Sequence, residues 1–91
     1  LAYVVDARYS EANASRITAL AAGADRLYIE AAFLEQDADR AAATAHLTAR
    51  QAGELGRRAG VQEVVPFHFS SRYEGRYREL EHEVLATFHA P

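Results

Sequence analysis

Arg26-Leu27-Tyr28-Ile29-Glu30 is the stretch that decides the fold of this chain. It is a short β-prone run that ends in a carboxylate, and similar runs cover residues 2–5 and 61–67. Helical patterns separate the three runs. Strands that alternate with helices pair in parallel through right-handed crossovers. The sequence therefore predicts an α/β domain with the element order β-α-β-α-α-β-α.

Helix start and stop signals lie between these runs. Ser10 is a suitable N-cap for a first helix, and Gly23 stands at its stop position. Thr48 and Gln51 have the capping-box spacing for a helix that ends at Gly60. Apolar residues at three- and four-residue spacing predict an amphipathic helix near the end of the chain. The predicted helices cover residues 11–22, 37–44, 49–60 and 74–88.

Packing expectations also follow from the pattern. Pro66 has no N–H to donate to a sheet, which predicts an edge strand or a strand end at that point. In the first helix, Ile17, Leu20 and Ala21 are expected on the inner face. Helices on one side of a three-stranded sheet would leave apolar surface that further chain has to bury.

Length and composition bound the class of protein. The chain has 91 residues, enough for one domain, and 49% of them are hydrophobic. It contains no methionine and begins inside a strand-like run, so we expect it to be the C-terminal part of a longer protein. A processed or engineered short protein is the alternative. No apolar run reaches the roughly 18 residues that a transmembrane helix needs.

Charge and cysteine content narrow the chemistry. The net charge is −3, which gives no sign of the basic face that is typical of nucleic-acid-binding proteins. Because there is no cysteine, disulfides and thiolate metal ligands are excluded. A metal ion bound by this chain would have to use histidine and carboxylate ligands.

Four residues are candidates for a functional site. Asp6, Glu30 and His68 lie at, or one step past, the ends of the strand runs, and His46 shortly precedes the helix start at Thr48. The C-terminal ends of parallel strands share one edge, where ligands bind, so these residues should converge. Carboxylates and imidazoles at such an edge suit a metal ion or proton transfer.

Each of the four also has an ordinary interpretation. Asp6 could be a surface or capping residue beside Arg8, His68 a packed side chain and His46 a loop residue. Glu30 is harder to explain in this way, because burying a carboxylate without a partner is costly. A metal ion held only by Asp6 and His68 would lack ligands, since zinc takes four, or three and a water.

Two motifs, in the right order, resemble those of a known family. They are His46-Leu47-Thr48 and His68-Phe69-Ser70-Ser71-Arg72-Tyr73, and they follow Val-Val-Asp at 4–6 and Ile-Glu-Ala-Ala-Phe at 29–33. With these motifs, the chain from Leu1 to Phe88 is similar to the C-terminal portion of the ribonuclease Z family. Those enzymes are tRNA 3′-processing endonucleases of the metallo-β-lactamase superfamily.

The resemblance implies a role for each candidate residue. Asp6 matches the aspartate that bridges two zinc ions, and His68 matches the last histidine ligand of one zinc. His46 and Glu30 match the pair that protonates the leaving oxygen after phosphodiester cleavage. Arg72 would contact phosphate, unless it pairs with a nearby carboxylate.

The same resemblance implies a larger assembly. Residues 1–91 would form a partial domain, the C-terminal half of an αββα sandwich, completed by the N-terminal half of the same protein. Further expectations are a cytoplasmic homodimer without membrane contact, two zinc ions in the full-length enzyme and a tRNA precursor as substrate. The isolated chain is expected to be inactive, because it lacks the His-x-His-x-Asp-His signature that binds most of the metal.

Departures from the family pattern keep other functions open. The family's His-Glu-Ala-Thr stretch is here Ile29-Glu30-Ala31-Ala32, and Val5 stands where glycine is usual before the aspartate. One alternative is another metallo-β-lactamase-type hydrolase that acts on a small ester, lactone or phosphodiester. The other is a non-catalytic α/β module that binds a partner protein.

Overall fold

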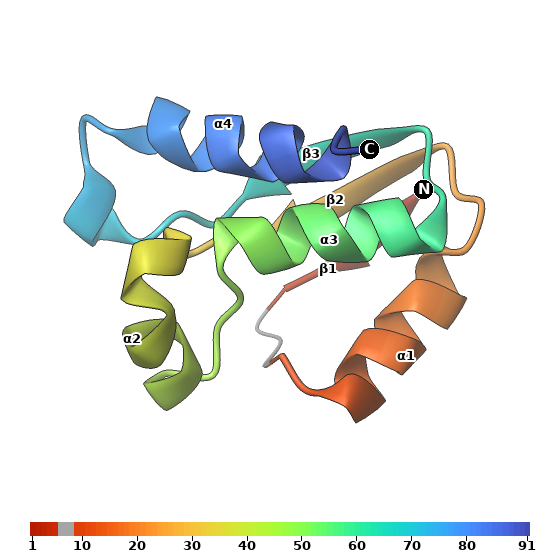
Figure 1. The fold of residues 1–91 in the computed structure, drawn as a ribbon, viewed down its shortest axis with the longest axis horizontal. Helices are drawn as coiled ribbons and strands as arrows, with labels where there is room; N and C mark the ends of the chain where they lie inside the picture. The colour runs from red at the N-terminus through yellow and green to blue at the C-terminus, as the bar shows by residue number, and fades with distance from the viewer. Residues whose placement is uncertain (6–8) are drawn as a thin grey trace.

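The computed structural model describes residues 1–5 and 9–91, and its centre is a parallel β-sheet (Figure 1). The sheet has three strands in the order β1 (Ala2–Val4), β2 (Arg26–Glu30) and β3 (Glu63–Phe67). Both neighbouring pairs are parallel, and Leu27 in the middle strand lies opposite Ala2 on one side and Val64 on the other. The predicted α/β class with parallel strands is confirmed.

Within the described residues, four α-helices and two short 3-10 helices connect and follow the strands. They are α1 (Glu11–Ala21), η1 (Glu35–Asp37), α2 (Ala38–Ala43), α3 (Ala49–Ala59), η2 (Ser71–Tyr73) and α4 (Tyr77–Phe88). The observed order contains the predicted β-α-β-α-α-β-α succession, with one 3-10 helix before α2 and one before α4. None of these helices has the length and apolarity needed to cross a membrane.

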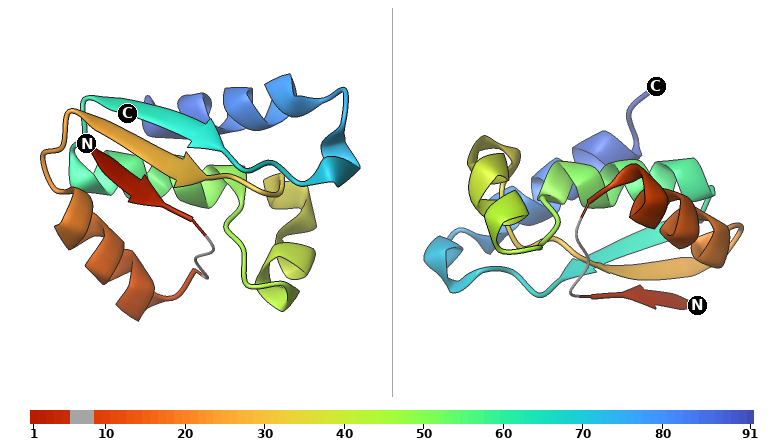
Figure 2. Two further views of the ribbon diagram at one scale, coloured as in Figure 1. Left: turned by 180° about the vertical axis from the view of Figure 1, so that it is seen from behind. Right: turned by 90° about the horizontal axis from the view of Figure 1, so that it is seen from below.

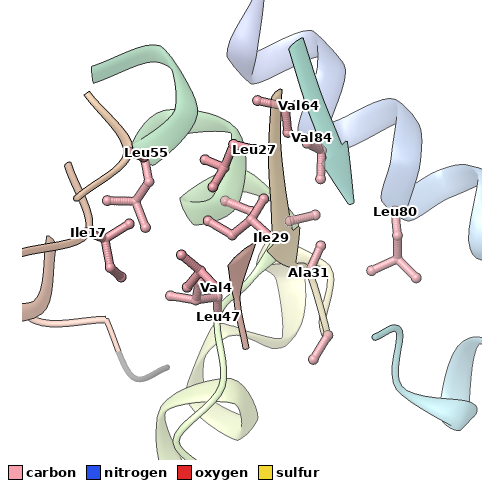
Figure 3. Packing of buried hydrophobic residues seen from close by; sticks show 14 of the residues in the cluster. Val4, Ile17, Leu27, Ile29, Ala31, Leu47, Leu55, Val64, Leu80 and Val84 are labelled. Carbon is pink, nitrogen blue, oxygen red and sulfur yellow. The ribbon is translucent and has the colours of Figure 1, made fainter. Parts of the chain in front are cut away.

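The three longest helices gather on one face of the sheet. Helix α3 packs against β2 and β3, α4 packs against α3 and β3, and α1 packs beside α3 (Figure 2). Leu27 and Ile29 of β2 are fully buried in the core that forms beneath these helices (Figure 3). On the other face of the sheet, Tyr3 is 61% exposed. The sheet is therefore covered from one side, as the pattern of three strands and helices predicts.

Local signals explain where the helices begin and end. The Ser10 hydroxyl accepts the Asn13 N–H at 3.1 Å and caps α1. Thr48 and Gln51 form a reciprocal capping box at the start of α3. Gly60 ends α3 in the left-handed conformation, which glycine adopts without steric cost. The predicted caps of these two helices are confirmed.

Two glycines allow α3 to lie close to its neighbours. A Cβ on Gly53 would sit 2.4 Å from the Val84 carbonyl oxygen of α4, and a Cβ on Gly56 would sit 2.4 Å from Val64 Cγ2 of β3. Both distances are far shorter than real carbon contacts, so a larger residue would push the helix away. The close approach fixes α3 over the sheet and with it the loop that enters its N-terminus.

Two elements begin more than one residue away from the predicted position. The last helix begins at Tyr77 rather than at 74, because η2 occupies the preceding segment and Gly75 then turns the chain with φ +83°. The third strand begins at Glu63 rather than at 61, after the turn that follows Gly60.

Packing positions agree with the pattern in part. Pro66 lies in β3, an edge strand of the three-stranded sheet, as its missing N–H predicts. In α1, Ala14, Ile17 and Ala21 are buried, but Leu20 is 73% exposed, so its expected place on the inner face is wrong. At 3.6 residues per turn, Leu20 lies about 120° around the helix from Ala14, outside the narrow stripe that contacts the core.

Candidate metal and proton-transfer site

The buried carboxylate of Glu30 is the centre of the candidate site. Glu30 ends β2 and is 0% exposed. Its Oε2 accepts the Leu47 N–H at 2.9 Å and lies 2.9 Å from His46 Nδ1, while its Oε1 lies 3.0 Å from His68 Nδ1. A buried carboxylate is costly without partners, and here both oxygens have them.

His68 reaches Glu30 from the end of β3. His68 follows Phe67, and the backbone of His68 is left-handed, with φ +62°. This conformation is uncommon outside glycine, although histidine adopts it more often than most residues do. Just beyond it, the Ser70 N–H donates to the Ala32 carbonyl at 2.9 Å. The His68 side chain remains 46% exposed. Conformations of this cost persist where the surroundings enforce them, and they cluster at functional sites.

His46 reaches the same carboxylate from the loop between α2 and α3. Ala45 precedes it with φ +60°, and the His46 N–H donates to the Ala41 carbonyl at 2.9 Å. Leu47 is fully buried, and its carbonyl accepts the Ala32 N–H at 3.1 Å. The loop is thus anchored to α2 on one side and to the segment after β2 on the other. The His46 side chain is 26% exposed.

A small open cavity lies beside the two imidazoles. The ring centroids of His46 and His68 are 5.7 Å apart, and the ring planes are inclined at 65°. The cavity has a volume of about 220 Å³. Besides the two histidines, it is lined by Ala32, Phe33, Thr44, Phe69 and Ser70. Both imidazoles therefore border a space that can receive a small group.

A buried tyrosine supports the loops of the site. The Tyr73 hydroxyl accepts the Leu34 N–H at 3.1 Å and donates to the Asp37 carboxylate. Burial raises the pKa of Tyr73, and the hydrogen bond to Asp37 raises it further. The Tyr73 ring meets Phe33 edge-on with centroids 6.2 Å apart, and the Phe33 ring lies 6.2 Å from that of His46. Tyr73 thereby joins the segment after β3 to the segment after β2.

The structure brings three of the four candidate residues together. Glu30, His46 and His68 form one hydrogen-bonded group at the shared sheet edge. Asp6 lies outside the described residues. Arg72 is exposed, and its guanidinium lies 5.8 Å from the centroid of the Tyr73 ring. Among the described residues it has no ion pair to a carboxylate.

Two contributors to the site escape the sequence analysis. The Leu47 amide is a backbone group, so no side-chain pattern identifies it as a partner of Glu30. Tyr73 is the last residue of the motif His68-Phe69-Ser70-Ser71-Arg72-Tyr73. Its contribution nevertheless depends on Leu34 and Asp37, which are 39 and 36 positions away in the sequence. The motif is the sequence signal that points to Tyr73, but only the fold brings Leu34 and Asp37 to its hydroxyl.

The donor set suits a metal ion such as zinc. One ligand atom from each of Glu30, His46 and His68 lies within 4.8 Å of the other two. Imidazole nitrogen and carboxylate oxygen are ligands that zinc accepts, but zinc takes four ligands. Residues of this group can therefore supply at most part of the coordination sphere of such an ion, which needs further ligands.

Comparison with known proteins gives curated relatives, although no protein-family model matches the chain. The chain is 43% identical over 91 residues to ribonuclease Z of Deinococcus radiodurans and 39% identical over 90 residues to ribonuclease Z of Bacillus velezensis. These alignments cover 99% and 97% of this chain but 28% of each relative. The chain therefore spans less than a third of their length.

The fold has a counterpart among solved structures. The chain superposes on the metallo-β-lactamase-fold protein YhfI from Bacillus subtilis with a TM-score of 0.77. The match covers 96% of this chain and 33% of that protein, at 24% sequence identity, so the likeness concerns the fold alone. The chain has the architecture of part of that fold.

Proposed function

Since this chain is homologous to ribonuclease Z over nearly its whole length and has part of a metallo-β-lactamase fold, we propose that it carries part of the active site of a zinc-dependent endonuclease. The proposed reaction is removal of the 3′ trailer from tRNA precursors. The observation that carries the proposal is the hydrogen bond between Glu30 and His46, formed beside His68. The activity is proposed for the complete protein, and the isolated chain is expected to be inactive.

His46 is the proposed proton donor to the leaving oxygen. Glu30 accepts its Nδ1–H at 2.9 Å and thereby orients the ring. The other ring nitrogen, Nε2, lies on the side of the ring away from Glu30. When Nε2 is also protonated, it can deliver that proton to a group that is bound in the cavity. General acid catalysis of this kind contributes about 10² to 10⁴ in rate.

His68 is the proposed metal ligand of this segment, together with Asp6, which lies outside the described residues. When bound, two zinc ions would supply a hydroxide nucleophile near neutral pH and neutralise charge on the scissile phosphate. Arg72 is the proposed contact to a substrate phosphate, because a guanidinium can bind phosphate oxygens in a bidentate manner.

The remaining metal ligands are proposed to come from an N-terminal half of the same protein. Among residues 1–5 and 9–91, no element covers one face of the sheet; Tyr3 of β1 and Val5, just after that strand, are 61% and 48% exposed. The Tyr3 ring stacks on Tyr28 with centroids 4.7 Å apart. The second sheet of an αββα sandwich would cover these rings. A cytoplasmic homodimer of the complete protein is part of the same proposal, and light scattering would test the dimer.

A chimera tests the proposal. This chain replaces the segment of Deinococcus radiodurans ribonuclease Z that aligns with it, and cleavage of a tRNA precursor is measured with zinc. We expect cleavage, and we expect His46→Ala to lower turnover by about 10² to 10⁴ with little change in zinc content. His68→Ala should lower zinc content as well as turnover. His82→Ala, at an exposed position of α4, is the control without either effect.

Other outcomes of this experiment would point elsewhere. A chimera that hydrolyses a small ester or phosphodiester but not the tRNA precursor would favour the alternative hydrolase. Activity that survives the loss of both His46 and His68 would contradict the site. Cleavage of a phosphodiester by the isolated 91-residue chain would contradict its expected inactivity.

A further inference from the structure

We infer that Glu30 is a shared positioning residue rather than a metal ligand, and that it holds both His46 and His68 as Nδ1–H tautomers. The inference extends the proposed function, on which the metal-binding role of His68 rests. The tautomers themselves follow from hydrogen bonds within the chain and do not depend on any substrate.

Both oxygens of the Glu30 carboxylate have hydrogen-bond partners within the chain. An ionised carboxylate only accepts hydrogen bonds, and a backbone N–H only donates them. Oε1 of Glu30 faces His68, and Oε2 faces both His46 and the Leu47 amide. Glu30 is 0% exposed. Both oxygens of this fully buried carboxylate are therefore engaged by groups of the chain, so Glu30 is placed to orient the two imidazoles rather than to bind a metal ion in the cavity.

Each imidazole has one nitrogen that does not face Glu30 and that stays available for a metal ion or a substrate group. The Nδ1 atoms of His46 and His68 face Glu30 at 2.9 and 3.0 Å, so each carries the proton that the carboxylate accepts. In a neutral imidazole the other nitrogen then has a free lone pair. Both rings line the cavity, and Nε2 is the atom that each offers there. A carboxylate that fixes the tautomer in this way is usual behind metal-bound histidines.

The two oxygens of Glu30 have different partners, and the substitution Glu30→Gln therefore affects the two histidines differently. In Glu30→Gln, the Leu47 N–H still donates and needs an acceptor, so the amide oxygen must take the Oε2 position. The amide NH₂ then faces His68. His68 Nδ1 has to accept this bond, its proton moves to Nε2, and the lone pair for a metal ion is lost. His46 keeps an acceptor opposite Nδ1, so its tautomer does not change.

Imidazole ¹H–¹⁵N NMR of the full chain reads the tautomers directly. In the wild type we expect Nδ1–H for both His46 and His68. In Glu30→Gln we expect His68 to become Nε2–H and His46 to stay Nδ1–H. The amide fingerprint verifies that the variant is folded, and His46→Gln and His68→Gln assign the signals.

Two results would overturn the inference. One is an Nε2–H tautomer for either histidine in the wild type, and this reading decides the matter even if Glu30→Gln does not fold. The other is a folded Glu30→Gln in which His46 changes or His68 does not.

Zinc affinity of the chimera described above separates this inference from the proposed function. Glu30→Gln should raise the Kd for zinc about 10- to 100-fold, the usual effect of losing a partner behind a metal-bound histidine. Glu81→Gln, exposed on α4, is the matched control and should leave the Kd unchanged. An unchanged Kd in Glu30→Gln would refute the positioning role. Expected tautomers in a chimera that binds zinc but cleaves no tRNA precursor would count against the proposed function alone.

Discussion

At the end of β2, Glu30 places a carboxylate where solvent cannot reach it, and its partners among the described residues include the Leu47 N–H and the Nδ1 atoms of His46 and His68. The hydrogen bonds offset the free-energy cost of burying the carboxylate. They also hold the groups that make them in fixed positions. His46 and His68 are thereby held at ring centroids 5.7 Å apart, although they come from different loops. One residue thus sets the orientation of two.

Tyr73 has a comparable role behind the cavity. Tyr73→Phe is expected to lower the free energy of unfolding by about 1 to 3 kcal/mol, because the Leu34 N–H and the Asp37 carboxylate lose a partner. Urea denaturation measures this change. Tyr77→Phe is the control: its ring is 36% exposed and the change should stay within about 0.5 kcal/mol. Equal effects of the two substitutions would contradict the role of the Tyr73 hydroxyl.

The raised pKa of Tyr73 also makes stability depend on pH in the alkaline range. Burial, and then the bond to Asp37, place the pKa of the folded state above the unfolded value of about 10. The neutral phenol therefore contributes stability that is complete below about pH 10 and is lost as pH rises through the folded pKa. From about pH 10 upward, the unfolding free energy of the wild type should fall more steeply than that of Tyr73→Phe. Parallel curves would argue against a shifted tyrosine.

Among the elements, α3 connects the core to the site. It lies over β2 and β3 and begins at the capping box that follows His46 and Leu47. Its glycines permit this position, because a Cβ on Gly53 would meet the Val84 carbonyl oxygen at 2.4 Å and Thr87 Cβ at 2.8 Å. Glycine at this position lowers the intrinsic stability of the helix but allows α3 to contact α4 closely.

Gly53→Ala tests that exchange. Alanine favours a helix over glycine by about 1 kcal/mol, but overpacking costs about 1 to 3 kcal/mol. We expect a net loss of stability in thermal or urea unfolding, because one of the clashing atoms belongs to the backbone of α4 and cannot turn aside. Arg50→Ala, exposed on the same helix, should change stability by no more than about 0.5 kcal/mol. A stabilised Gly53→Ala would show that α3 and α4 can separate freely.

At the scale of the whole molecule, the helices cover one side of the sheet (Figure 2). On the other side, the rings of Tyr3 and Tyr28 are stacked. Phe67 of β3 meets the Tyr3 ring edge-on, with centroids 6.2 Å apart. A row of aromatic rings across three strands is apolar surface of the kind that marks a contact with further protein. The proposed second layer of the sandwich would use it.

Tyr3→Ser compares the isolated chain with the chimera. In the isolated chain only the ring contacts are lost, worth about 0.5 to 1.5 kcal/mol. If the second sheet covers the ring, the loss in the chimera should be larger by about 1.5 to 3 kcal/mol. Leu20→Ser, at a site 73% exposed on α1, should have the same small effect in both proteins. An equal effect of Tyr3→Ser in both would mean that the rings stay uncovered.

Much of the fold could be predicted from the sequence because its signals act over short distances. Ser10 caps α1, Thr48 and Gln51 cap α3, and Gly60 ends it, all through contacts within a few residues. Leu20 shows the limit of such signals. Its apolar character favours the core, but which stripe of a helix is buried depends on what the helix packs against.

The sequence by itself determined the alternation of strands and helices, and therefore the common edge at which Glu30 ends β2 and His68 follows β3. Only the tertiary structure decided how that edge is used. Three partners of Glu30 among the described residues lie 16, 17 and 38 positions away, and one of them is a backbone amide. Hydrogen bonds over such separations form only when the packing of α3 and the turn at His68 bring the groups together, and no local pattern of residues encodes that packing.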